Sequence, residues 1–135
     1  SFKVEILKAV HNFNTSGGDT FNLALYTSSA TLNEDTTVYI TANEVATATG
    51  YTAKGKALTS VTPVLSGDTA VCDFDNVSWT SASFTSRGCL IFNDSAASDQ
   101  SVCSIDFGGD KTVTSGTFTI EFPAATAGNA IIGIA

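Results

Sequence analysis

The amino-acid sequence predicts an all-β protein, mainly an antiparallel β-sandwich of jelly-roll-like topology, with a short N-terminal helix. Several short segments alternate between apolar and polar residues, which is the pattern of strands that bury one face. Turn-forming clusters rich in Gly, Asp, Asn and Ser separate these segments, as they do in sandwiches. A set of phenylalanines falls on inward strand positions and can fill the space between two sheets. These are Phe21, Phe74, Phe107, Phe118 and Phe122.

The length and composition favour one domain over residues 1–135, with a core that needs neither a disulfide nor a metal. Hydrophobic residues make up 43% of the chain and charged residues only 14%. The polar surface must therefore consist largely of Thr, Ser, Asn and Gly. A surface with so few charges does little to prevent association between molecules, so we expect neighbouring subunits to cover part of it.

The charge balance argues against nucleic acid as a partner. The formal net charge is −7, and the 6 Lys and Arg residues are spread thinly. Affinity for nucleic acid comes mainly from clustered basic side chains that release counterions. No apolar run reaches the length of a membrane helix, so we expect no membrane contact.

The cysteines are expected to be free and buried. Cys72, Cys89 and Cys103 are odd in number and have apolar neighbours. They lack the paired spacing of a zinc site. Free thiols are typical of proteins assembled in a reducing cytoplasm.

Residues 2–13 are the best helix candidate, and a short strand over residues 2–6 is the alternative. Apolar side chains recur here at intervals of three and four residues: Phe2, Ile6, Ala9, Val10 and Phe13. Residues 20–27 alternate and predict a strand. Residues 28–50 have no clear period, apart from a possible strand over 36–41 and a helical piece near 43–48. We therefore expect this segment to be an excursion that can contact a partner.

The middle of the chain predicts a hairpin followed by a loop. Pro63 places the strand over residues 61–65 at a sheet edge or a bulge, because proline cannot donate a ladder hydrogen bond. Residues 66–69 are a hairpin signal, and residues 70–75 alternate again. Trp79, the only tryptophan, is expected in a polar loop or bulge over residues 76–83, where it caps one end of the core.

Residues 84–93 are expected to form a central strand. Its unbroken apolar run from Cys89 to Phe92 requires cover on both faces. Residues 102–107 and 117–122 alternate as two further strands, and residues 108–111 between them predict a flexible loop. The apolar tail over residues 130–135 is expected to form a last strand.

Arg87, the only arginine, lies at the start of the apolar run and is the main candidate for a specific contact. Its planar fork suits a carboxylate partner. Asp73, Asp75 and Asp106 are strand residues that can supply it. The pair Arg87 with Asp73 or Asp106 is expected either to hold the fold or to bridge two subunits.

No pattern indicates catalysis, a cofactor or a metal site. His11 is the only histidine and has no nucleophile motif beside it; a position on a helix surface or end is expected. Asp73, Asp75 and Asn76 could ligate calcium but lack the loop spacing and the distal Glu, which favours a solvated strand face. The 13 acidic residues allow many carboxylate pairs, none of which stands out. We expect a protein that is not an enzyme.

Five blocks together resemble a family of small virion proteins of tailed bacteriophages. They are FKVEILKAVHNF, DTFNLALYTSSATL, GYTAKGKALT, VSWTSASFTSRGCLIFND and IDFGGDKTVTSGTFTIEFPA. The resemblance spans almost the whole chain and carries no catalytic motif. Cys89 and Cys103 depart from it, because plain small or aliphatic residues are expected at these strand positions.

The resemblance implies a β-rich structural protein of the virion, assembled in the host cytoplasm. A capsid decoration (cement) protein that binds and stabilises the assembled head is favoured. Its expected partners are the major capsid protein, other virion proteins and copies of itself, with a trimer preferred. Residues 1–13 and 130–135 are the segments expected to reach a neighbour.

Two alternatives remain open. One is a tail or head–tail connector component. The other is a carbohydrate- or receptor-binding module, which would stack sugars on exposed aromatic rings. The candidate rings are Tyr26, Tyr39, Tyr51 and Trp79.

Overall fold

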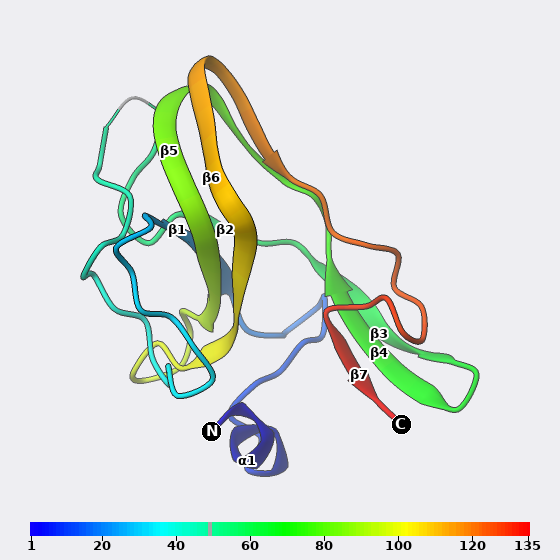
Figure 1. Ribbon diagram of the computed structural model, residues 1–135. Coiled ribbons are helices and arrows are strands. Elements are labelled where there is room, and N and C mark those ends of the chain that lie inside the picture. The colour runs from blue at the N-terminus through cyan, green and yellow to red at the C-terminus, as the bar shows by residue number, and fades with distance from the viewer. Residues whose placement is uncertain (49) are drawn as a thin grey trace.

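The structure is a computed structural model that describes residues 1–48 and 50–135. Over these residues it forms one short helix and seven strands in two antiparallel sheets (Figure 1). The helix is α1 (Phe2–Leu7). The strands are β1 (Phe21–Tyr26), β2 (Lys56–Ala57), β3 (Ser60–Ser66), β4 (Thr69–Phe74), β5 (Val77–Asn93), β6 (Ser101–Ile120) and β7 (Ile132–Ile134). The expected all-β class with a short N-terminal helix is confirmed.

One sheet has the order β2-β1-β5-β6 and the other the order β3-β4-β7. The long antiparallel pair β5–β6 extends through most of the molecule, and β3–β4 forms a hairpin that projects from it (Figure 1). β3 is an edge strand whose register shifts between Val61 and Val64. The expectation that Pro63 marks an edge or bulge is confirmed. The hairpin at residues 66–69 and the last strand within residues 130–135 are also confirmed.

The central strand β5 is buried on both faces, as its apolar run predicts. Cys89 and Ile91 are fully buried in the main core, which side chains from both sheets share. Leu90 and Phe92 point to the opposite face, where a second apolar cluster forms with Ala24 and other residues. Side chains from residues 30–40 cover that second cluster, so the long excursion after β1 closes the outer face of the sheet.

The N-terminal helix is shorter than its apolar period predicts. α1 ends at Leu7, and Ala9 has a φ of 55°, a left-handed conformation that commonly terminates helices. The backbone beyond it runs to the core, where the Phe13 ring stacks on Phe21 with 4.3 Å between centroids. The free energy gained by burying the Phe13 ring in the core outweighs that of one further helical turn.

Two segments predicted as loops lie within strands. Trp79 lies on β5, is 1% exposed, and pairs in register with Phe118, so it belongs to the core and not to a loop. The alternative of a bulge is confirmed, because the register of β5 shifts between Trp79 and Ala82. Residues 108–111 lie within β6. There the register passes from Gly88↔Asp106 to Ser86↔Lys111, which leaves residues 107–110 as an extra bulged stretch. Gly108 takes a φ of 73° in this bulge.

The excursion over residues 28–50 contains neither the strand over 36–41 nor the helical piece near 43–48, within the part that the structure describes. Val38 makes an isolated bridge to Gln100, and Glu44 another to Tyr26. Side-chain contacts, described below, hold this segment in place.

Candidate interaction surfaces

Arg87 and Asp106 form an ion pair at the surface. Arg87 Nε donates to Asp106 Oδ1 at 2.9 Å, and the two side chains are 40% and 67% exposed. The hydrogen bond from Arg87, together with one from the Gly108 N–H, lowers the pKa of the Asp106 carboxyl. Because both groups are so exposed, the pair contributes little to folding stability.

Asp73 is not a partner of Arg87. It lies on β4 in the other sheet and is 1% exposed. Its Oδ1 accepts a hydrogen bond from the Phe74 N–H at 2.9 Å, and its Oδ2 has no partner among the described residues. Of the carboxylates proposed from the sequence, the structure places only Asp106 beside Arg87. The expected solvated strand face is wrong for Asp73, whose side chain is buried, whereas Asp75 and Asn76 are exposed and follow the end of β4.

The cysteine thiols are free and packed, as expected. Cys72 and Cys89 are buried and Cys103 is half-buried. Burial raises the pKa of Cys72 to about 12 and that of Cys103 to about 11. Burial also raises the pKa of Cys89. These thiols are therefore protonated and weakly nucleophilic at neutral pH.

His11 is buried rather than placed on a helix surface. Its Nε2 lies 3.2 Å from Glu5 Oε2, and its Nδ1 lies 3.2 Å from Asn93 Nδ2. The Asn93 amide also donates to Asp19 Oδ2 at 2.7 Å. These contacts fasten the segment after α1 to the end of β5, which is a structural role.

A second polar cluster, the Glu44 network, fastens the excursion to the sheet. Glu44 accepts hydrogen bonds from the Tyr39 hydroxyl at 2.5 Å and the Tyr51 hydroxyl at 2.7 Å. It also accepts one from the Lys54 N–H at 2.8 Å. The Lys54 ammonium then bridges Asp94 at 2.7 Å and Asp99 at 2.9 Å. The sequence did not reveal this network, because its members are far apart and no motif links them.

The aromatic rings proposed for sugar stacking are not displayed on the surface. Tyr26, Tyr51 and Trp79 are each 1% exposed, and the half-buried Tyr39 stacks on Phe92 with 4.8 Å between centroids. A sugar-binding platform needs open aromatic faces, so these four residues do not form one.

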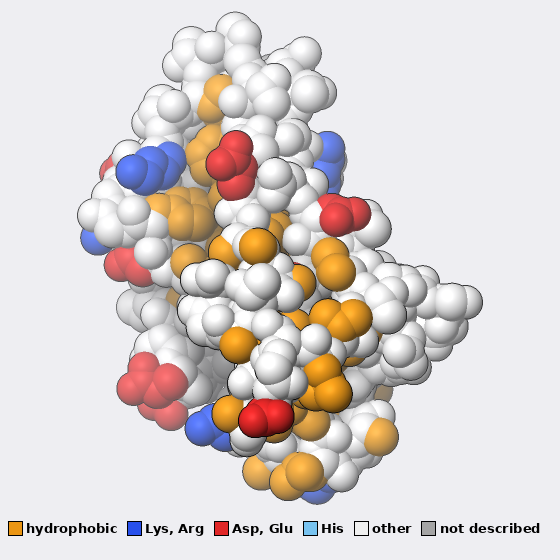
Figure 2. All heavy atoms as spheres, turned by 90° about the vertical axis from the view of Figure 1, so that its right-hand side faces the viewer, with side chains coloured by type: hydrophobic (Ala, Val, Ile, Leu, Met, Phe, Trp, Pro, Cys, Tyr) orange, Lys and Arg blue, Asp and Glu red, His pale blue; other side chains and the backbone are white. Residues whose placement is uncertain are grey.

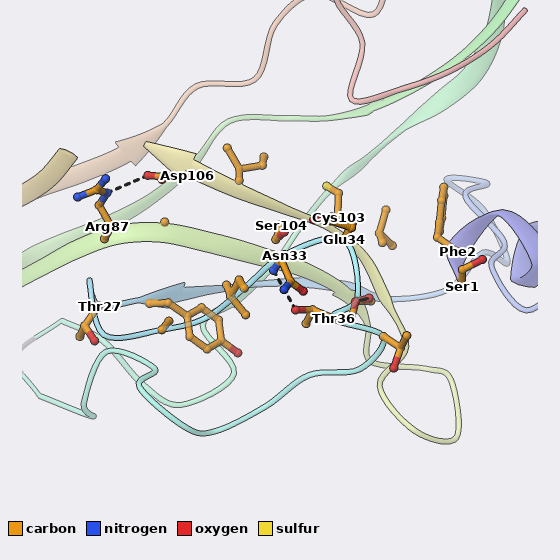
Figure 3. Close-up of a pocket in the computed structure, with 18 of the residues that line it drawn as sticks. Ser1, Phe2, Thr27, Asn33, Glu34, Thr36, Arg87, Cys103, Ser104 and Asp106 are labelled. Carbon is orange, nitrogen blue, oxygen red and sulfur yellow. Dashed lines mark hydrogen bonds and ion pairs between the residues drawn. The ribbon is translucent and has the colours of Figure 1, made fainter. Parts of the chain in front are cut away.

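The edge groove is an open hollow of about 770 Å³ beside the start of β6 (Figure 3). Residues 101–106 of β6 line one side, the chain between Thr27 and Thr37 lines another, and the start of α1 closes one end. The Arg87–Asp106 pair lies at the opposite end from Ser1 and Phe2 (Figure 3). Hydroxyl-bearing side chains are frequent in the lining: Thr27, Thr36, Thr37, Ser101 and Ser104.

The apolar end is the set of exposed apolar side chains on α1, β3 and β7. Among the described residues, the exposed large hydrophobic side chains all lie on these three elements. They are Val4, Leu7, Val64, Leu65 and Ile134. Leu65, Ala70 and Ile134 are neighbours in register across the three-stranded sheet. Figure 2, viewed from the side of this sheet, shows apolar side chains running from the middle of the face to its lower end.

No group of three or more His, Cys, Asp or Glu side chains suited to a metal ion occurs within residues 1–48 and 50–135. No helix in the described part of the chain is long and apolar enough to cross a membrane. The fold and these surfaces define an all-β protein of two antiparallel sheets. Comparisons of the chain with models of known protein families, with curated proteins and with solved structures found no match.

Proposed function

We propose that the chain is a bacteriophage virion structural protein, a capsid decoration protein that binds the assembled head and stabilises it. It is assembled in the host cytoplasm and acts in the virion. Its partners are the major capsid protein and further copies of itself, with a trimer favoured. It carries out no catalysis and needs no cofactor.

The apolar end is the observation that carries this proposal. Leu7 is 88% exposed and Leu65 74% exposed, although both are residues that proteins normally bury. Leu65 and Ile134 adjoin Ala70 in register, and exposed apolar side chains that neighbour one another in this way indicate a surface that a partner covers. Complete burial of one Leu contributes about 1.5–3 kcal/mol, so burial of these side chains would supply part of the binding free energy.

The remaining chemistry is compatible with a structural role. The net charge of −7 can complement basic regions of a shell protein. A protein that binds only the assembled shell stabilises it by mass action over all copies that bind. The sequence blocks that resemble small virion proteins of tailed phages support the same assignment.

The number of copies on purified particles tests the proposal. On the order of hundreds of copies per virion are expected for a protein that repeats with the symmetry of the shell. Particles that lack the protein should lose resistance to heat and osmotic shock. About a dozen copies or fewer would instead indicate a tail or connector component. Unchanged resistance of particles without the protein would refute a cementing role.

A receptor- or carbohydrate-binding role is disfavoured, because the aromatic residues that it would use are covered. A screen of the purified protein against a glycan array tests it directly. Binding of any glycan class with saturation would restore this role.

A further inference from the structure

β6 is an edge strand of the four-stranded sheet. The hydrogen bonds of β1 show which β6 residues direct their backbone N–H and C=O groups away from β5. Leu25 donates its N–H to the Tyr51 hydroxyl at 2.8 Å and accepts from the Val45 N–H at 2.8 Å. Both backbone groups of Leu25 therefore point away from β5. Along an antiparallel strand, the backbone groups of successive pairs point alternately to either side. The backbone N–H and C=O of Cys89, the register partner of Leu25, therefore point toward β6 and bond to Ile105.

Ser104 and Asp106 flank Ile105, so their backbone N–H and C=O groups point away from β5 and toward the edge groove. No other strand of the described chain pairs with β6. Each of these residues therefore presents one unused donor and one unused acceptor. A row of such groups is a template for an added strand.

Residues 37–39 of the same chain already bond to the beginning of this edge, at residues 99–101. Ser101 donates its N–H to the Thr37 carbonyl at 2.9 Å, and Tyr39 donates its N–H to the Asp99 carbonyl at 2.9 Å. Val38 and Gln100 form an antiparallel bridge between these bonds. Thr36 also contacts this edge, because its carbonyl accepts a hydrogen bond from the Ser101 hydroxyl. The chain turns at residues 33–36, where the Asn33 N–H donates to Thr36 Oγ1 at 3.1 Å (Figure 3). Beyond Ser101, no segment of the described chain pairs with this edge. An added strand there would continue the line of residues 37–39, which already lie antiparallel to β6.

The lining of the groove indicates what can occupy it. Lys3 and Arg87 balance Glu34 and Asp106, and two of these four charges already neutralise each other. The groove therefore favours an uncharged segment over a strongly basic or acidic one. Its walls recess the edge, so a flexible arm can enter where the edge of another folded sheet cannot.

We infer that the edge groove binds an extended, uncharged arm of the head shell protein, which pairs with Ser104 and Asp106 as an added β-strand. This inference rests on the proposed function and specifies one contact that the apolar end does not make. The two terminal segments of the described chain are folded as α1 and β7, so neither of them supplies the arm.

Replacement of one residue separates the backbone contact from side-chain effects. Ser104→Pro removes the outward N–H, and an edge strand tolerates proline where the N–H faces away from the ladder. Ser104→Ala keeps that N–H and is the matched control. The probe is purified phage heads stripped of the protein, and co-sedimentation measures the dissociation constant. We expect Ser104→Pro to weaken binding about tenfold or more and Ser104→Ala to leave it within about twofold.

Hydrogen exchange of the unmodified protein gives a second readout that does not depend on the folding of a variant. The amides of Ser104 and Asp106 should exchange rapidly in the free protein and slowly on heads. The Ile105 amide, which faces β5, should exchange slowly in both states.

The outcomes distinguish this inference from the proposed function. If the protein binds heads but Ser104 and Asp106 stay unprotected, or if Ser104→Pro binds as well as Ser104→Ala, the groove contact is refuted and head binding stands. If the unmodified protein does not sediment with heads, both proposals fall.

Discussion

Glu44 is the residue on which the excursion after β1 depends. Its carboxylate accepts from two tyrosine hydroxyls and a backbone N–H, and these donors come from both sides of residue 44 in the chain. The Tyr51 hydroxyl in turn accepts the N–H of Leu25, a strand residue. One carboxylate thus connects the excursion to the sheet, although residues 27–55 contain no regular element in the described part.

Glu44→Ala should lower the free energy of unfolding by about 2–4 kcal/mol, because several half-buried donors lose their acceptor. Urea titration followed by Trp79 fluorescence measures the change. Glu34→Ala is the control, since Glu34 is exposed, and its effect should stay within about 0.5 kcal/mol. Equal effects of the two substitutions would contradict the role given to Glu44.

The tyrosines of this network predict sensitivity to alkali. Desolvation, followed by the hydrogen bond to Glu44, raises the pKa of Tyr39 to about 12 from the usual 10.0. Burial also raises the pKa values of Tyr26 and Tyr51. The unfolded chain ionises first, so stability is complete below pH 10 and falls as the pH rises from 10 toward 12. Tyrosinate absorbance and circular dichroism should therefore change together, and tyrosinate formed without unfolding would refute this account.

The segment between residues 50 and 56 lies unusually close to β1. A Cβ placed on Gly55 would lie 1.8 Å from the Leu23 carbonyl oxygen, and the φ of Gly55 is 64°. Gly67, at the hairpin turn, has nearly the same φ of 63° and open space around it. A comparison of alanine substitutions at these two positions therefore separates the cost of steric crowding from the cost of the left-handed backbone.

Gly67→Ala should cost about 1–2 kcal/mol, the cost of a left-handed conformation for a residue with a Cβ. Gly55→Ala should cost clearly more, because the strand or the loop must also move apart. Thermal unfolding of the two variants measures the difference. A similar melting temperature for both would show that β1 and this segment separate easily.

The apolar end unites elements from the two ends of the chain. α1 and β7 have few residues, and their exposed apolar side chains have no evident use within the described fold. Substitution there should affect partner binding and leave folding unchanged, since exposed positions seldom matter for stability.

Leu7→Lys and Leu65→Lys should each weaken binding to phage heads about tenfold or more, because a buried charge replaces a buried Leu. Their free energies of unfolding should change by no more than about 0.5 kcal/mol. Thr114→Lys, an exposed position on β6, introduces the same charge away from the apolar end and should bind normally. Normal binding by all three variants would exclude the apolar end as the contact.

For the whole molecule, the combination of few charges and exposed apolar side chains on α1, β3 and β7 favours association with further copies. Charged residues make up only 14% of the chain. Light scattering should show a mass that rises with concentration toward a trimer, and Leu65→Lys should reduce this rise. A single monomeric species at high concentration would contradict self-association.

The sequence by itself determined the fold class and most strand positions, because strand alternation and turn chemistry are local properties. The double-sided burial of residues 89–92 and the edge position of Pro63 followed from the same reasoning. Arg87 was identified as an ion-pair residue because it is the only arginine and adjoins a buried strand.

Only the tertiary structure decided the contacts between distant residues. Trp79 and residues 108–111 join strands because the long β5–β6 pair extends through a bulge, and long-range register is not encoded in a local period. The choice of Asp106 over Asp73 required knowledge of which sheet holds each residue. The edge groove and the apolar end depend on which edges and faces remain uncovered after folding. That outcome is a property of the complete packing, and no single segment carries it.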